Sequence, residues 1–141
     1  MSEIYVAYWS GTGNTQAMAE AVAKGVTAAG GTAKLVSLED ITPADLANES
    51  AYALGCPAMG AEELEETVVE PFIAELESNC SGRKIALFGS YDWGDGEWMR
   101  TWTARMQEAG AFIVNDEGLI ANNTPDDDAL AACEELGKAL V

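Results

Sequence analysis

Short apolar runs alternate with segments of helical periodicity along the chain, and this alternation constrains the fold more than any other feature of the sequence. Runs of strand length predict strands at residues 4–9, 32–38, 51–55 and 84–89, and a last strand region at residues 112–114 and 118–120. Apolar residues at helical spacing predict helices at residues 15–29, 43–47, 63–77, 97–109 and 126–140. Five β/α units in this order indicate an α/β fold.

The predicted strands are nearly continuous apolar runs, which are typical of a parallel sheet covered by helices on both faces. In an open sheet of this kind, ligands bind beyond the carboxyl ends of the strands, where the strand order reverses. The functional loops are therefore expected after Trp9, Gly55, Gly89 and Ile120. The sequence has no internal repeat or linker, so residues 1–141 are expected to form a single domain.

The chain is strongly acidic. It has 24 Asp and Glu residues against 7 Lys and Arg residues, which gives a net charge of -17. This charge repels phosphodiester backbones and anionic lipid surfaces, so nucleic acid and membranes are not expected as partners. The same charge would keep a small protein soluble or guide it to basic partners, and charge alone leaves both interpretations open.

Several sequence features that are missing limit the chemistry that the protein can perform and the cellular compartment expected for it. The N-terminus lacks the basic and long apolar regions of a signal peptide, and no apolar run approaches the ~20 residues of a membrane span. Cys56, Cys80 and Cys133 match neither a zinc site nor a CxxC pair, so they are expected to be reduced thiols of a cytoplasmic protein. The sequence contains no histidine, the commonest general base and metal ligand. Hydrolytic chemistry, a catalytic residue and a metal site are therefore not expected.

The loop after the first predicted strand has the composition of an anion-binding loop. Its residues are Ser10, Gly11, Thr12, Gly13, Asn14 and Thr15. Backbone N–H groups and the positive end of the helix that follows attract an anion, and the hydroxyls can donate to phosphate oxygens without a cation. Taken alone, this composition also suits an ordinary capped turn.

Two other nucleotide-binding loops fit the residues less well. A P-loop requires a lysine, and no lysine stands in or near this loop, which argues against NTP hydrolysis. A dinucleotide-binding fingerprint would continue from Gly11 and Gly13 to a third glycine at position 16, where the chain has Gln16. Glu39 does stand where a ribose-binding acid could follow the second strand, so this alternative stays open.

The loop from Ser10 to Thr15 resembles the phosphate loop of the flavodoxin family, Ser/Thr-x-Thr-Gly-x-Thr. Residues 55–64 and 89–98, which follow the third and fourth predicted strands, resemble the flavin-ring loops of short-chain flavodoxins of anaerobic bacteria. The resemblance covers all five units in order. It implies a flavodoxin-like doubly wound, five-stranded parallel sheet of order 2-1-3-4-5 with helices on both faces, and non-covalently bound flavin mononucleotide (FMN).

The resemblance also implies roles at the flavin ring. Met59 and Trp93 would stack on its two faces, which suits a large flat apolar surface. Glu62 would accept a hydrogen bond from ring N3–H. The alternative for Met59 and Trp93 is packing in the core, which is the role expected for Trp98 and Trp102 at helical spacing. The alternative for Glu62 is that it is one more solvated charge in an acidic run. The expected cofactor-binding residues of the ring loops are Pro57, Ala58, Met59, Gly60, Glu62, Ser90, Tyr91, Asp92, Trp93 and Gly94.

Gly60 would also serve as the family's redox switch, a peptide that rotates so that its carbonyl meets N5–H of the reduced flavin, because a residue without Cβ rotates at little cost. The sequence departs from the family pattern at two positions. Asp92 stands where glycine is expected, and Ala61 stands where a polar residue is common. Asp92 bears on the geometry of the loop that carries Trp93.

The function implied is that of a flavodoxin, a low-potential one-electron carrier that substitutes for ferredoxin. Its partners would be redox enzymes with basic docking surfaces, and it would be a cytoplasmic monomer rather than an enzyme. The main alternative is a small FMN-dependent NAD(P)H reductase, although the chain has no evident substrate-binding insertion. A phosphate-sensing receiver of the same fold is a further alternative, but Tyr8 and Trp9 stand where a receiver carries its acidic metal-binding pair.

Overall fold

The computed structural model describes residues 3–11, 13–59, 63–92 and 94–141, and its centre is a parallel six-stranded sheet. The strand order is β2-β1-β3-β4-β5, and β6 also pairs with β4. This order confirms the predicted sheet, with β6 as an addition. The strands are β1 (Glu3–Tyr8), β2 (Thr32–Ser37), β3 (Ala51–Gly55), β4 (Lys84–Tyr91), β5 (Phe112–Ile113) and β6 (Leu119–Asn122).

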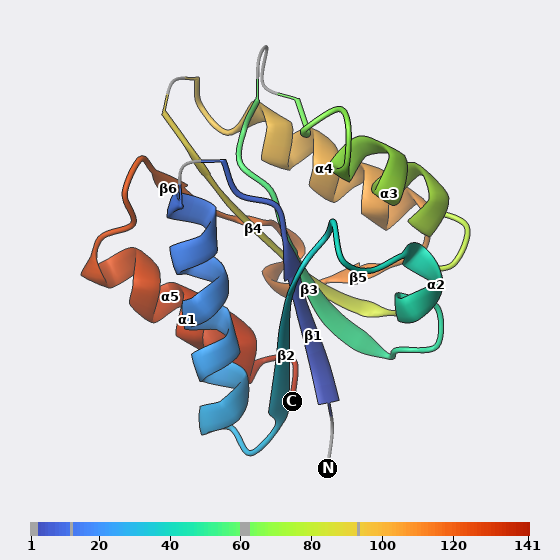
Figure 1. Cartoon of the computed structure of the whole chain (residues 1–141), viewed down its shortest axis with the longest axis horizontal. Helices are drawn as coiled ribbons and strands as arrows, with labels where there is room; N and C mark the ends of the chain where they lie inside the picture. Colours follow the sequence, from blue (N-terminus) through green and yellow to red (C-terminus); the bar gives the residue numbers. More distant parts are fainter. Residues whose placement is uncertain (1–2, 12, 60–62, 93) are drawn as a thin grey trace.

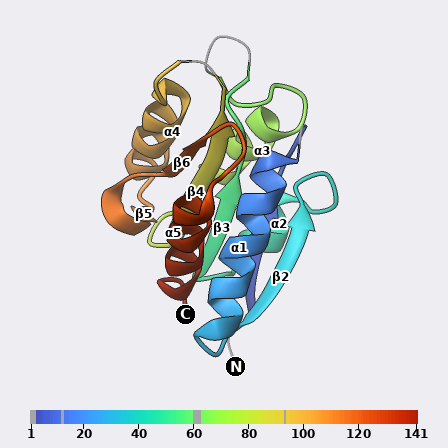
Figure 2. The same ribbon diagram turned by 90° about the vertical axis from the view of Figure 1, so that its left-hand side faces the viewer.

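Helices cover both faces of the sheet. Figures 1 and 2 show α1 and α5 on one face and α2, α3 and α4 on the other. Apart from α3, the predicted elements agree with the observed ones to within two residues at each end. The helices are α1 (Asn14–Ala28), α2 (Pro43–Leu46), α3 (Val69–Leu76), α4 (Glu97–Glu108) and α5 (Asp127–Lys138).

The last strand region is divided into two pieces that share one neighbour. β5 pairs with the start of β4, where Lys84 lies opposite Phe112. A 3-10 turn, η1 (Val114–Asp116), interrupts the strand, and β6 then pairs with the end of β4, where Tyr91 lies opposite Asn122. This second pairing carries the last strand up to the carboxyl edge of the sheet, where the predicted functional loops lie.

The third helix is shorter than predicted. The sequence pattern predicts a helix over residues 63–77, but α3 spans Val69–Leu76. Glu63 instead forms an isolated antiparallel bridge with Met59. The Glu65 carboxylate accepts hydrogen bonds from two backbone amides just before the helix. Because backbone and side-chain groups of this segment are committed to a turn, the helix begins at Val69.

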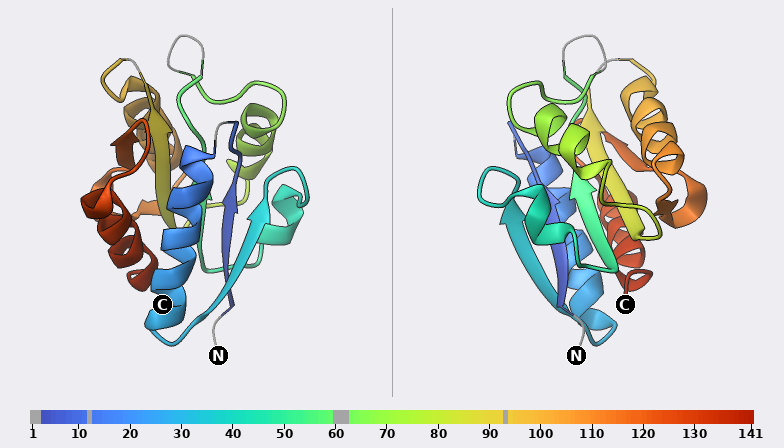
Figure 3. Two further views of the ribbon diagram at one scale, coloured as in Figure 1. Left: turned by 60° about the vertical axis from the view of Figure 1, so that its left-hand side comes forward. Right: turned by 90° about the vertical axis from the view of Figure 1, so that its right-hand side faces the viewer.

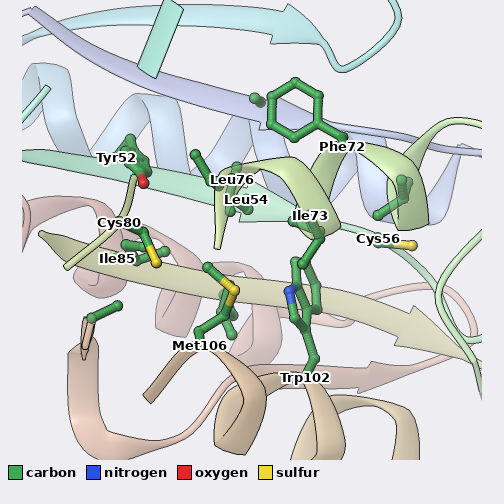
Figure 4. Close-up of a cluster of buried hydrophobic side chains, with 14 of the residues drawn as sticks. Tyr52, Leu54, Cys56, Phe72, Ile73, Leu76, Cys80, Ile85, Trp102 and Met106 are labelled. Atoms are coloured by element: carbon green, nitrogen blue, oxygen red, sulfur yellow. The ribbon is translucent and has the colours of Figure 1, made fainter. Parts of the chain in front are cut away.

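The core between the sheet and α3 and α4 is large and apolar (Figure 4). Side chains of α3 and α4 interdigitate over β3 and β4, and Trp98 and Trp102 are each 1% exposed, which confirms their predicted packing role. Each fully buried aliphatic side chain in such a core contributes about 1.5–3 kcal/mol. Residues labelled in Figure 4 include Tyr52, Leu54, Ile73, Leu76, Ile85, Trp102 and Met106.

On the opposite face, α1 and α5 pack closely because each has a glycine at the contact. A Cβ on Gly25 would lie 1.9 Å from the carbonyl oxygen of Glu134 in α5. A Cβ on Gly137 would lie 2.0 Å from the carbonyl oxygen of Val22 in α1. The two backbones therefore touch at these positions, and neither glycine can take a side chain without moving a helix.

The loops that follow β1, β3 and β4 gather at one end of the molecule, and the two chain termini lie near the opposite end (Figure 3). Cys56, Cys80 and Cys133 are all buried and form no disulfide. Burial raises the pKa of the Cys56 thiol to about 12, so it is protonated at neutral pH. Within the described residues, no helix combines the length and apolar character needed to cross a membrane.

Candidate functional site

The loop after β1 presents a helix N-terminus that no acidic side chain neutralises. Gly13 is the N-cap of α1, with φ of 96°, and it has no side chain to cap the helix. The first turn carries no acidic residue. The Ser10 hydroxyl oxygen accepts hydrogen bonds from the backbone N of Gly13 at 3.0 Å and of Gln16 at 3.3 Å. In this structure the Ser10 hydroxyl therefore accepts from two of the amides that could donate to an anion at this helix N-terminus. Thr12, the third hydroxyl of this loop, lies outside the described residues.

A buried pair of hydroxyls joins this loop to β4. Thr15 is 1% exposed and Ser90 is 4% exposed, and their hydroxyl oxygens are 3.0 Å apart. The backbone N of Ser90 also donates to the Thr15 hydroxyl at 3.3 Å. If the Ser90 hydroxyl donates as well, the Thr15 proton is available for a further acceptor. Two residues predicted at the cofactor site are thus in direct contact across 75 positions of sequence.

A cavity of about 380 Å³ lies between the three loops. It combines apolar and polar side chains and reaches from the phosphate-type loop to the predicted ring loops. Eight of the residues predicted to hold a cofactor line it. They are Gly11, Asn14, Pro57, Ala58, Met59, Ser90, Tyr91 and Asp92.

The segment after β3 forms a hairpin that carries Met59. Backbone groups of Met59 and Glu63 exchange two hydrogen bonds of 2.9 Å, and the backbone N of Ala58 donates to the Ser90 carbonyl at 3.0 Å. Met59 is 36% exposed, which does not fit the alternative that it fills the core. It lies where a flat ligand in the cavity would contact its thioether. Gly60, Ala61 and Glu62, including the predicted redox switch and N3 acceptor, lie outside the described residues.

The segment after β4 is held by the end of β6. The Tyr91 ring packs against Trp98 with ring centroids 5.7 Å apart. Asp92 is not among the residues with positive φ, so an aspartate is tolerated there although the family pattern has glycine. Gly94 has φ of 88°, a conformation that favours glycine. Trp93, the predicted second ring wall, lies outside the described residues.

The end of β6 and the residue that follows it also contribute to the site. The Asn122 side-chain amide donates to the carbonyls of Tyr91 at 3.3 Å and Asp92 at 3.4 Å. Asn123 lines the cavity, and its backbone N donates to the Tyr91 carbonyl at 2.6 Å. The sequence predicts a functional loop after Ile120 but singles out no residue in it. The signal available was a pair of adjacent carboxamides at the end of a strand, at the edge where ligands bind.

Several carboxylates near the ends of α3 and α4 are paired with arginines. Arg100 forms ion pairs with Asp95 at 2.9 Å and with Glu97 at 2.7 Å. Arg105 is paired with Glu70 and Glu77 and so joins the two helices that follow the ring loops. Other carboxylates on this end of the molecule are exposed. These are Glu63, Glu66 and Asp92.

The arrangement fits a phosphate-bearing ligand with a planar apolar part. It offers a helix N-terminus without acidic residues and hydroxyls at one end, and Met59 and backbone polar groups at the other. Within the part of the chain that the structure describes, no group of three or more His, Cys, Asp or Glu residues could hold a metal ion.

Comparisons with known proteins agree with this geometry. A sequence model of the family described as flavodoxin matches residues 6–136. The chain is 46% identical over 136 residues to a flavodoxin of Megasphaera elsdenii, and 47% identical over 135 residues to a flavodoxin of Clostridium beijerinckii. Each match covers 96% of both chains. The solution structure of the two-electron reduced Megasphaera elsdenii flavodoxin has a TM-score of 0.85 at 46% identity and covers 99% of this chain and 98% of its own.

Proposed function

Because the chain belongs to the flavodoxin family, and is therefore an FMN-binding electron-transfer protein rather than an enzyme, we propose that it is a low-potential one-electron carrier that takes the place of ferredoxin. FMN supplies the electron chemistry when bound, and the protein supplies binding, orientation and electrostatics. The observation that carries this proposal is the cavity of about 380 Å³, which is lined by Gly11 and Asn14 of the first loop, by Met59 and by Ser90 of β4.

The phosphate of FMN is proposed to bind the loop of residues 10–15. The N-terminus of α1 attracts the anion, and backbone N–H groups and hydroxyls donate to its oxygens. Thr15 supports this role because its hydroxyl accepts from the backbone N of Ser90, and its own proton is free for the phosphate when the Ser90 hydroxyl is the donor of the pair. The proposed phosphate ligands are Ser10, Gly11, Thr12, Gly13, Asn14 and Thr15.

The flavin ring is proposed to bind between the loops after β3 and β4. Met59 would contact one face and Trp93 the other, with Gly60 and Glu62 at the ring edge. Asn122 and Asn123 support the second loop through the Tyr91 carbonyl. The remaining proposed contacts come from Pro57, Ala58, Ser90, Tyr91, Asp92 and Gly94.

Exposed carboxylates support the proposed low potential. Asp92 lines the cofactor cavity, Glu63 and Glu66 line a second hollow that shares Met59 with it, and these negative charges oppose the addition of an electron. For a one-electron couple, a repulsion of about 1.4 kcal/mol lowers the reduction potential by about 59 mV. Asp95 and Glu97 contribute less than their number suggests, because Arg100 lies between them.

The partners are proposed to be redox enzymes with basic docking surfaces, because the net charge of -17 favours association with positive patches. The protein is further proposed to be a cytoplasmic monomer with residues 1–141 as one domain. The absence of disulfides among three buried cysteines supports a reducing compartment.

Electron transfer to a ferredoxin-dependent oxidoreductase should depend strongly on salt. The second-order rate constant is expected to fall by about an order of magnitude or more between about 10 mM and 150 mM salt, as the Debye length shortens from about 30 to 8 Å. Stopped-flow mixing of the reduced protein with the oxidised enzyme measures it. A rate constant that does not change with salt, or that rises, would argue against a basic docking surface.

A further inference from the structure

The hairpin that carries Met59 is followed directly by a buried acid. Met59 and Glu63 close the hairpin with two backbone hydrogen bonds of 2.9 Å. Two residues later, Glu65 turns inward and is only 4% exposed. We propose that Glu65 is a positioning residue that fixes the base of this hairpin and thereby seats the flavin ring. This proposal rests on the proposed contact between Met59 and the ring.

The Glu65 carboxylate is satisfied by a single short segment. It accepts hydrogen bonds from the backbone N of Thr67 at 2.5 Å and of Val68 at 2.9 Å, and also from the Thr67 hydroxyl. Burial acts to raise the pKa of Glu65, but hydrogen bonds from Thr67, Val68 and Val69 outweigh burial and hold that pKa below its ordinary value. At neutral pH the carboxylate is therefore ionised and accepts hydrogen bonds from the backbone amides that precede α3. The dipole of α3 also favours a negative charge at this position.

Backbone groups of Glu65 connect the same point to the sheet and to α3. Its N–H donates to the Cys56 sulfur at 3.5 Å, and its carbonyl accepts from the backbone N of Glu70 at 2.8 Å. Cys56 is bonded in turn to the Phe88 carbonyl at 3.1 Å, and its own carbonyl accepts the Trp98 indole N–H at 3.1 Å. Glu65 therefore joins the returning arm of the hairpin to β3, β4 and α4, the elements beside both ring loops.

Two hollows beside the hairpin make this anchoring necessary. Met59 lines the cofactor cavity and also a second cavity of about 350 Å³, whose lining includes Trp9 and Glu65. Met59 is itself 36% exposed. Met59 borders two cavities, so close packing does little to fix its position. The hydrogen bonds at the base of the hairpin therefore hold it in place.

A pair of adjacent variants separates anchoring from charge. Glu65→Gln and Glu66→Gln each remove one negative charge from the same segment, but Glu66 is exposed. In Glu65→Gln the amide nitrogen cannot accept a hydrogen bond, so a buried donor loses its partner. We expect the dissociation constants of FMN and of riboflavin to rise by the same factor, about tenfold, in Glu65→Gln and by less than about twofold in Glu66→Gln.

Two further measurements and one further variant complete the test. The amides of Met59 and Glu63 should exchange hydrogen faster in the apoprotein of Glu65→Gln than in that of Glu66→Gln, and the visible circular dichroism of bound FMN should change only in Glu65→Gln. Thr67→Val removes a hydroxyl donor without changing charge and should cause a smaller loss of the same kind. It carries the test if Glu65→Gln does not fold.

The variant Met59→Ala separates failure of the proposed ring site from failure of the positioning role of Glu65. If Met59→Ala leaves riboflavin affinity unchanged, the proposed ring site is wrong. If Met59→Ala weakens both ligands while Glu65→Gln matches Glu66→Gln in affinity and hydrogen exchange, only the positioning role of Glu65 is wrong. If Thr67→Val has wild-type affinity and exchange, the role of Glu65 is likewise contradicted.

Discussion

Replacement of Thr15 by alanine is expected to weaken FMN binding by about one to two orders of magnitude, because a hydrogen bond to a charged oxygen contributes roughly 1.5–3 kcal/mol. Thr15 is 1% exposed, and its hydroxyl lies 3.0 Å from that of Ser90. Riboflavin lacks the phosphate, so its affinity should fall much less. Fluorescence titration of the apoprotein with each flavin measures both losses.

Two further variants show which hydroxyl matters. Thr15→Ser keeps the oxygen and should recover most of the FMN affinity. Ser90→Ala removes the partner but leaves the Thr15 hydroxyl, so its loss for FMN should be smaller than that of Thr15→Ala. Losses of equal size for FMN and riboflavin in Thr15→Ala would exclude contact with the phosphate and point to a general disturbance of the cavity.

Replacement of Gly25 by alanine is expected to destabilise the apoprotein by about 3 kcal/mol, the upper end of the usual cost of overpacking. The added Cβ would lie 1.9 Å from the Glu134 carbonyl oxygen, so α1 and α5 must separate. Alanine favours a helix over glycine by about 1 kcal/mol, so propensity alone predicts a change of opposite sign. Urea unfolding of the apoprotein measures the free energy difference without the contribution of bound flavin.

Lys24→Ala is the matched control for this prediction. Lys24 precedes Gly25 in the same helix, its side chain is 75% exposed, and it lies 3.9 Å from Glu134 in a surface ion pair. Its loss should change stability by less than about 1 kcal/mol. Gly137→Ala should resemble Gly25→Ala, because its Cβ would lie 2.0 Å from the Val22 carbonyl oxygen. A Gly25→Ala variant as stable as Lys24→Ala would mean that the two helices do not touch there.

Periodicity alone predicted the α/β alternation, because strands buried on both faces and amphipathic helices leave distinct patterns. It did not predict that α3 begins at Val69, because the acidic and apolar residues before it also suit a helix. Nor did it reveal the close contact of Gly25 and Gly137, which appear in sequence only as weak helix formers. Both features depend on tertiary contacts that a local pattern does not contain.

Sequence patterns indicate the parts of the candidate site that lie in loops of distinctive composition. They do not indicate residues whose role depends on burial by the rest of the fold. Gly11, Met59 and Ser90, which are predicted to bind the cofactor, line the cavity, and their contact with a flavin stays a prediction. Glu65 could not be told from Glu66 in an acidic run, since only the fold buries one and exposes the other.

The role of Asn123 could not be predicted either, because it also depends on tertiary structure. Its place in the cavity depends on β6 pairing with the end of β4, and the two segments are far apart in sequence. Asp92 appeared to conflict with the family pattern, but the backbone there does not require glycine. The predictions for Thr12, Gly60, Glu62 and Trp93 concern residues outside the described ranges and stay predictions.

The measurement that tests the central claim most directly is a titration of the apoprotein with FMN and with FAD, followed by absorbance and flavin fluorescence. The account predicts tight binding of one FMN per chain and much weaker binding of FAD, because the phosphate loop opens straight into α1 and leaves no evident place for an adenosine. Binding of FAD as tight as that of FMN, or no binding of FMN, would contradict the account.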